Sequence, residues 1–167
     1  MKLQHTFFIL FILFALFLNP AHAGNTEPRN RVERMDLAAL DELMKSQGAP
    51  DIIALMAAWC GPCIEELPVL NKLYGEYKNE GFKLVGVALD LKGPSAMQPV
   101  VDRLNVNFPI YWVGEEAVEA YRIDKLPMLF VVEDGKITER IHGKRSEKFL
   151  KEKIRNMCDS KKMNRGQ

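Results

Sequence analysis

The sequence predicts an α/β fold in which helices cover both faces of a mixed central β-sheet. Short apolar segments bounded by turn residues alternate with longer segments of helical periodicity, as in strands joined by helices. Later in the chain, two strand-like segments flank Asp134-Gly135, a typical hairpin turn, so part of the sheet is expected to be antiparallel. The order strand, helix, strand, helix, then a hairpin and a closing helix therefore predicts one mixed sheet.

Each element is indicated by its own signals. Asp36 is a capping residue ahead of a helical pattern, Ser146 plays the same part for the last helix, and Pro68 lies inside a longer helix. The expected helices span about 36–46, 60–81, 94–105, 115–122 and 146–158. The expected strands span 51–57, 82–90, 108–113, 126–132 and 136–141.

The first 23 residues have the pattern of an export signal. Lys2 gives a basic start, residues 7–18 are twelve consecutive apolar residues, and Ala21-His22-Ala23 is a small-x-small cleavage site. We expect cleavage before Gly24 and a periplasmic or secreted location. The apolar run is shorter than the roughly 18 to 20 residues that span a bilayer, and the alternative is an N-terminal anchor facing the periplasm.

Residues 24–167 suit a single domain. We expect a flexible leader over 24–34, a folded domain over 35–158 and a basic, disordered tail over 159–167. After residue 23 the chain has 22 Lys and Arg against 22 Asp and Glu, so no overall charge favours nucleic acid as a partner. We expect a monomer.

The pentapeptide Trp59-Cys60-Gly61-Pro62-Cys63 lies between a predicted buried strand and a predicted helix. Two thiols three positions apart form a reversible dithiol/disulfide pair, and Pro62 fits the first helical turn, where its missing N–H is not needed. Cys60 then caps the helix, where unpaired N–H groups and the helix dipole stabilise a thiolate. We predict Cys60 as the nucleophile and Cys63, one turn further in, as the resolving thiol.

Two alternatives for the cysteines are half of a zinc site and a static structural disulfide. A zinc site would need a second ligand pair, and the candidates Cys158 and His142 are both remote from the motif. We assign neither residue a catalytic or metal-binding role, and we expect no cofactor and no metal.

Further segments accompany the cysteine motif, namely Glu66-Leu67-Pro68, Phe108-Pro109, Leu126-Pro127 and Asp134-Gly135-Lys136-Ile137. In this order and spacing they resemble the exported thioredoxin-fold oxidoreductases of the TlpA/ResA type, over most of residues 24–167. The resemblance implies a thioredoxin-like fold. It also implies the TlpA-type insertion of about 25 residues between the second core strand and Tyr111.

The resemblance implies roles for four more residues. In such folds the proline before the third core strand is cis and its loop faces the cysteines; Pro127 matches it, and Leu126 is expected to pair with an extended substrate peptide. Glu66, one turn after Cys63, is expected to assist loss of the Cys63 proton, unless it is an ordinary exposed helix residue. Trp59 is expected to shield the disulfide and contribute to docking, unless it is a core residue.

Two positions depart from the pattern of related proteins, and the orientation of a third residue can be predicted. Ala54 stands where cytoplasmic thioredoxins have a buried aspartate, and Met128 stands where many relatives have threonine, which predicts a more apolar groove. Glu65 points about 100° away from Glu66 and is expected to be a surface charge.

The expected function is that of a thiol:disulfide oxidoreductase for protein disulfides. Gly61-Pro62 is the thioredoxin pairing and favours a reductant. The resemblance implies reduction of apocytochrome c before haem attachment, with a membrane thiol donor supplying electrons. The alternatives are a disulfide-forming oxidant, a thioredoxin-fold peroxidase, for which the expected threonine before Cys60 is missing, and a non-enzymatic metal-binding module that uses the same cysteines.

Overall fold

A computed structural model describes residues 30–165 of the chain. The strands are β1 (Glu33–Arg34), β2 (Ile52–Met56), β3 (Leu84–Ala88), β4 (Ile110–Trp112), β5 (Met128–Glu133) and β6 (Lys136–His142). The helices are α2 (Leu37–Lys45), α3 (Gly61–Tyr77), α4 (Pro94–Leu104), α5 (Glu116–Ala120) and α6 (Glu147–Arg165), with a 3-10 turn, η1 (Lys78–Glu80). None of the helices in this part of the chain has the length and apolar character needed to cross a membrane.

The six strands form one sheet in the order β1-β4-β3-β2-β5-β6. The sheet is mixed, as the sequence predicts, but the two-residue strand β1 was not expected. The first four strands in this order are parallel, whereas β5 is antiparallel to β2 and β6 is antiparallel to β5. The β5–β6 hairpin turns at Asp134 and Gly135, which both have positive φ, at 49° and 74°. This conformation matches the right-handed twist of the flanking strands.

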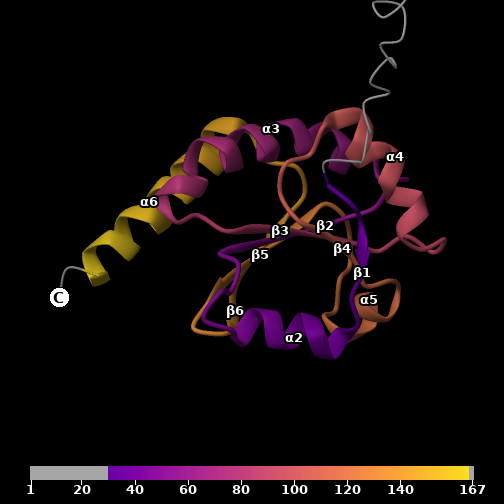
Figure 1. Cartoon of the computed structure of the whole chain (residues 1–167), viewed down its shortest axis with the longest axis horizontal. Helices are drawn as coiled ribbons and strands as arrows, with labels where there is room; N and C mark the ends of the chain where they lie inside the picture. Colours follow the sequence, from indigo (N-terminus) through magenta and orange to yellow (C-terminus); the bar gives the residue numbers. More distant parts are fainter. Residues whose placement is uncertain (1–29, 166–167) are drawn as a thin grey trace, which may run out of the picture.

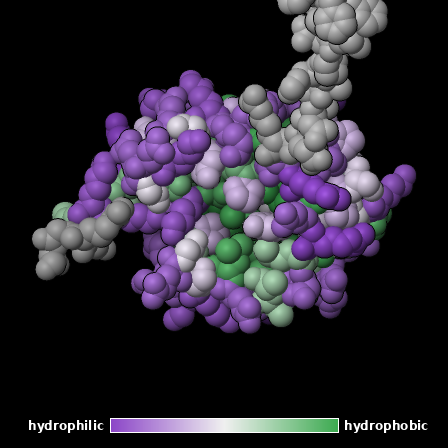
Figure 2. All heavy atoms as spheres, viewed as in Figure 1, coloured by the Kyte–Doolittle hydropathy of each residue, from purple (hydrophilic) through white to green (hydrophobic). Residues whose placement is uncertain are grey.

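Helices cover both faces of the sheet, with α3, α4 and α6 on one face and α2 and α5 on the other (Figure 1). Because β2 is buried on both faces, its side chains are apolar throughout and alternate between two cores. Ile52, Ala54 and Met56 belong to the core under α3 and α6, and Ile53 and Leu55 belong to the core over α2. In the same view, apolar residues show between the sheet and α2, and the outer sides of the helices are polar (Figure 2).

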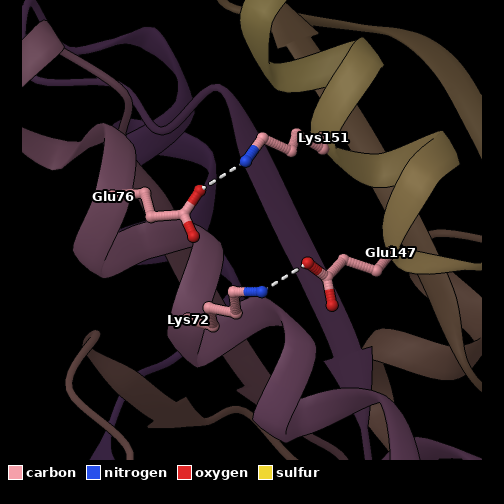
Figure 3. A network of polar contacts seen from close by, with 4 residues as sticks. All are labelled: Lys72, Glu76, Glu147 and Lys151. Atoms are coloured by element: carbon pink, nitrogen blue, oxygen red, sulfur yellow. Dashed lines mark hydrogen bonds and ion pairs between the residues drawn. The ribbon is translucent and has the colours of Figure 1, made fainter.

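Two ion pairs join α3 and α6 (Figure 3). Lys72 lies 2.6 Å from Glu147, and Lys151 lies 3.0 Å from Glu76. All four side chains are at least one third exposed, so the pairs contribute little to the free energy of folding.

The folded domain extends beyond the predicted limits at both ends. The expectation of a flexible leader is wrong for residues 30–34, because Val32 is buried, its N–H donates to Gln98 on α4 (2.8 Å), and β1 pairs with β4. The expectation of a disordered tail is wrong for residues 159–165, which continue α6, with Lys161 bound to Asp51. The predicted export signal and residues 24–29 lie outside the described residues.

Most other element boundaries differ from the prediction by a few residues. Strands β3 and β4 are shorter than expected, and α3 continues through Pro68 to Tyr77. The capping residues are as predicted, since Asp36 accepts the N–H of Ala39 (2.7 Å) and Ser146 accepts that of Phe149 (3.3 Å). The segment between β3 and β4, where the insertion is expected, forms α4.

Candidate functional site

The cysteine pair lies at the edge of the sheet where the parallel strands end. β2 ends at Met56, and a tight turn follows, in which Cys60 N–H donates to the carbonyl of Ala57 (3.0 Å) before α3 begins. Binding and catalytic residues of open α/β sheets gather at this carboxyl edge, because the loops leaving the strands meet there.

Cys60 and Cys63 form a disulfide at the N-terminus of α3. Cys60 is the N-cap, and its sulfur accepts the N–H of Cys63 at 3.3 Å, while Pro62 occupies the first turn. After reduction, the same N–H and the positive end of the helix dipole would stabilise a Cys60 thiolate. Both residues are buried, with 5% of Cys60 and 2% of Cys63 exposed, so the capping position distinguishes them more than exposure does.

Glu66 is a buried carboxyl group one turn after Cys63. Its side chain accepts the backbone N–H of Arg145 at 2.7 Å. Burial raises the pKa of Glu66 above its usual value, an effect opposed by the Arg145 hydrogen bond and by the charges of Arg145 and Lys144. Only 2% of the residue is exposed, which excludes the alternative of an ordinary surface position. The neighbouring Glu65 is a surface charge paired with Lys144, as expected.

The Leu126-Pro127 loop lies at the same edge, because β5 is antiparallel to β2 and begins where β2 ends, with Leu55 opposite Met128. The peptide bond between Leu126 and Pro127 is cis, as the resemblance implies. Pro127 is buried, and its carbonyl accepts the N–H of Gly143 at 2.8 Å. Within residues 30–165, no hydrogen bond engages the backbone N–H or carbonyl of the half-buried Leu126.

Trp59 and Met128 differ sharply in exposure. Trp59 is 69% exposed beside the disulfide, which excludes the alternative of a core tryptophan. Met128 is completely buried in the core over α2, so the expectation that it makes the groove more apolar is wrong. Its side chain follows the alternation of β5 and points away from the surface.

Asp90 is a residue of this edge that the sequence analysis did not single out. It follows β3, only 2% of it is exposed, and its Oδ1 accepts the N–H of Ala58 at 2.9 Å, two residues before Cys60. Burial raises the pKa of Asp90, while the Ala58 hydrogen bond lowers it. The available signal was a carboxyl residue directly after a buried strand at the edge that carries the cysteines.

The surroundings of His142 and Cys158 do not indicate a catalytic role for either residue. His142 Nδ1 lies 3.2 Å from Asp124 Oδ1 at the end of β6, and Cys158 is a free thiol buried in the core under α6. Burial raises the pKa of Cys158. Within residues 30–163, no group of three or more His, Cys, Asp or Glu side chains is placed to hold a metal ion.

The fold and the site together define a thioredoxin-like protein with a Cys-Gly-Pro-Cys pair at the start of a helix. The AhpC/TSA family model matches residues 29–140, more than half of the chain, and the chain therefore belongs to the AhpC/TSA family. Its likeness to individual proteins is to thiol-disulfide oxidoreductases of the TlpA/ResA type.

Three relatives illustrate this likeness. The chain is 28% identical to the thiol-disulfide oxidoreductase ResA of Bacillus thuringiensis subsp. konkukian over 116 residues, which are 68% of this chain and 66% of the relative. StoA of Bacillus subtilis is 28% identical, with a TM-score of 0.52 over 60% of this chain and 78% of StoA. A Chlorobium tepidum protein provisionally assigned as the thiol:disulfide interchange protein DsbE is 25% identical, with a TM-score of 0.60 over 71% of this chain and 84% of that protein.

Proposed function

We propose that this chain is an exported thiol:disulfide oxidoreductase that reduces disulfides in other proteins. The observation that carries the proposal is the Cys60–Cys63 disulfide at the N-terminus of α3, with the buried Glu66 one turn further along. The names of the similar proteins support the same activity. The sequence of residues 1–23 supports export.

The reaction begins with the reduced pair. The Cys60 thiolate attacks one sulfur of a substrate disulfide, forming a mixed disulfide and releasing the other substrate sulfur as a thiolate. Cys63 then loses its proton and attacks the Cys60 sulfur, which releases the second substrate sulfur. Two electrons pass to the substrate, and the protein is left with the Cys60–Cys63 disulfide.

Glu66 assists the second step by accepting the proton of Cys63. A thiol is a poor nucleophile until it is deprotonated, and Cys63 is buried among apolar residues where no solvent base reaches it easily. A carboxyl group whose pKa is raised by burial holds and releases a proton closer to neutral pH than an exposed one does. We also propose that Trp59, Leu126 and Pro127 dock an extended segment of the substrate.

The Gly61-Pro62 pair supports the proposed direction of electron flow, from this protein to its substrate. In an oxidising compartment the protein needs a thiol donor to return it to the reduced form, and we propose a membrane thiol donor for this role. Apocytochrome c is the proposed physiological substrate. A reduction potential near that of thioredoxin, about −270 mV, would support this direction, and one near about −120 mV would indicate a disulfide-forming oxidant instead.

A trapping experiment tests the activity and the substrate together. Replacing Cys63 with serine should leave Cys60 joined to its substrates, because the thiol that resolves the mixed disulfide is missing. The double variant Cys60→Ser, Cys63→Ser retains the buried Cys158 and is the matched control. Mass spectrometry should find captured proteins, including apocytochrome c, on the single variant alone. Equal capture by both variants, or rapid peroxide consumption with Cys60 as sulfenic acid, would contradict the proposal.

A further inference from the structure

Asp90 contacts the loop that leads into the cysteine pair. Its Oδ1 accepts the N–H of Ala58 (2.9 Å), and its backbone carbonyl accepts the indole N–H of Trp112 (2.6 Å), so the loop after β2 and strand β4 both hold it. Its second carboxyl oxygen, Oδ2, is buried and has no hydrogen-bond partner among the residues that the structure describes. A buried carboxylate oxygen without a partner is costly, and such groups are characteristic of functional sites.

The Asp90 carboxyl group is bonded to the chain two residues before Cys60. The N–H that it binds belongs to Ala58, and two residues of chain span at most about 7 Å between Cα atoms. The turn in which Cys60 N–H donates to Ala57 shortens this distance further. A negative charge at Asp90 therefore acts on the Cys60 sulfur through the interior of the protein, where screening is weak.

No positive charge compensates Asp90 within the described part of the chain. The guanidinium of Arg34 stacks on the Trp112 ring, 4.6 Å from the centroid, and forms no ion pair with Asp90. The titratable and charged groups on β1 and β4, in the loop that follows β3 and at the cysteine pair are Glu33, Arg34, Tyr111, Lys92, Cys60 and Cys63. None of them forms a hydrogen bond or ion pair with its carboxylate.

We infer that Asp90 is a positioning residue that holds the Trp59-Cys60 loop through Ala58 and, by its charge, sets how readily Cys60 ionises. The inference deepens the proposed function, on which it rests, because it concerns the reactivity of the same cysteine. The hydrogen bond and the charge have separable effects. The hydrogen bond keeps the sulfur at the helix N-terminus, and the charge opposes a second negative charge on the Cys60 sulfur.

The test is the rate at which iodoacetamide alkylates Cys60 in the reduced protein, measured against pH with the modified site located by mass spectrometry. Asp90→Asn keeps an oxygen that can accept the Ala58 N–H and removes the charge. We expect the midpoint of its profile to fall by about one pH unit, so that Cys60 reacts about tenfold faster below the midpoint. Asp90→Ala also removes the acceptor, and we expect slower insulin reduction despite the easier ionisation.

Asp51→Asn is the matched control. Asp51 is also buried and accepts a backbone N–H, that of Lys83 at 2.8 Å, but at the opposite edge of the sheet. Its alkylation profile should coincide with that of the original protein. An unshifted profile for Asp90→Asn, or an equal shift for Asp51→Asn, would overturn the inference. If the original protein fails to reduce protein disulfides while Asp90→Asn still shifts the profile, the proposed function fails and the inference stands.

A measurement on the unsubstituted protein covers the case in which Asp90→Asn does not fold. The amide proton of Ala58 is bonded to the Asp90 carboxylate, so its NMR chemical shift should move as Asp90 gains a proton on acidification. The rate of Cys60 alkylation should depart from a single titration over the same pH range. An Ala58 amide shift that is constant while the protein remains folded would overturn the inference.

Discussion

The two edges of the sheet each hold a buried aspartate that accepts a backbone N–H, and the two aspartates differ in the other partners of their carboxylates. Asp51, at the edge where β2 begins, binds Lys83 N–H (2.8 Å) and forms an ion pair with Lys161. Asp90, at the edge where β3 ends, binds Ala58 N–H (2.9 Å) and has one oxygen without a partner. The charge is neutralised at one edge and left uncompensated at the other.

The surroundings of the two edges show the same contrast. Beside Asp51 lies an open cavity of about 730 Å³ with Lys83, Lys153 and Lys161 in its lining, so charges there have partners and access to water. Beside the cysteines, Asp90 and Glu66 are two carboxyl groups whose pKa values are both raised by burial. The first edge therefore contributes to stability, and we propose that the second gives up some stability to control the reactivity of the cysteines.

The largest expected effect that tests this contrast comes from Glu66→Gln. Without a carboxylate to accept the Cys63 proton, resolution of the mixed disulfide should slow by about a hundredfold, the lower range for loss of a general base. Stopped-flow measurement of the release of a reduced substrate would show this. Glu65→Gln, which changes a neighbouring exposed carboxylate on the same helix, should leave the rate unchanged. An equal loss in both variants would mean that general charge, and not proton transfer, is responsible.

The same variant should change how stability depends on pH. Between the usual pKa of a glutamate and the raised pKa of Glu66, the folded protein binds more protons than the unfolded chain, so its free energy of unfolding falls as pH rises. Glu66→Gln removes this contribution. Urea unfolding curves of the oxidised proteins should therefore converge in acid and separate with rising pH, with the variant more stable. Parallel pH dependences would contradict the assignment of a raised pKa.

Asp51→Ala should have the opposite pattern, with lower stability and unchanged activity. It leaves the N–H of Lys83 without an acceptor and removes the partner of Lys161, which should cost about 2 kcal/mol in the free energy of unfolding. Urea denaturation measures this, and insulin reduction measures activity. Asp51→Asn keeps an acceptor and should lose less stability. A loss of activity well below the unfolding transition would show that the two edges are not independent.

Trp59→Ala should have the smallest effect of the three substitutions. Because 69% of the residue is exposed, its removal should not lower stability, but the loss of an aromatic docking residue should raise KM by about tenfold with kcat nearly unchanged. Met163→Ala is a matched control, because Met163 is 68% exposed and lies far along α6. If kcat fell instead of KM rising, Trp59 would act on the reaction itself and not on docking.

Features that depend on local chemistry could be predicted from the sequence. The Cys60 cap, Pro62 in the first turn and the position of Glu66 all follow from residues within two turns of one another. The mixed sheet and the hairpin at Asp134-Gly135 follow from the order of apolar segments and one turn signal.

Features that depend on distant partners could not be predicted. Asp90 meets Ala58 across 32 positions of the sequence, and β1 is a strand of two residues that exists through its pairing with β4. The end of α6 reads as a polar tail, and its order becomes apparent only when Lys161 is placed beside Asp51. The burial of Met128 depends on which way β5 alternates, a property fixed by its register with β2.

Arg145 lies in the connection between β6 and α6, and its backbone N–H points at the carboxylate of Glu66 from 2.7 Å away. A carboxylate accepts this bond more strongly than a carboxylic acid does. If Glu66 takes up the proton of Cys63 as proposed, the Arg145 amide should exchange faster with deuterated solvent in that state. This one amide can therefore serve as a gauge of where the proton resides, without any label on the sulfur atoms.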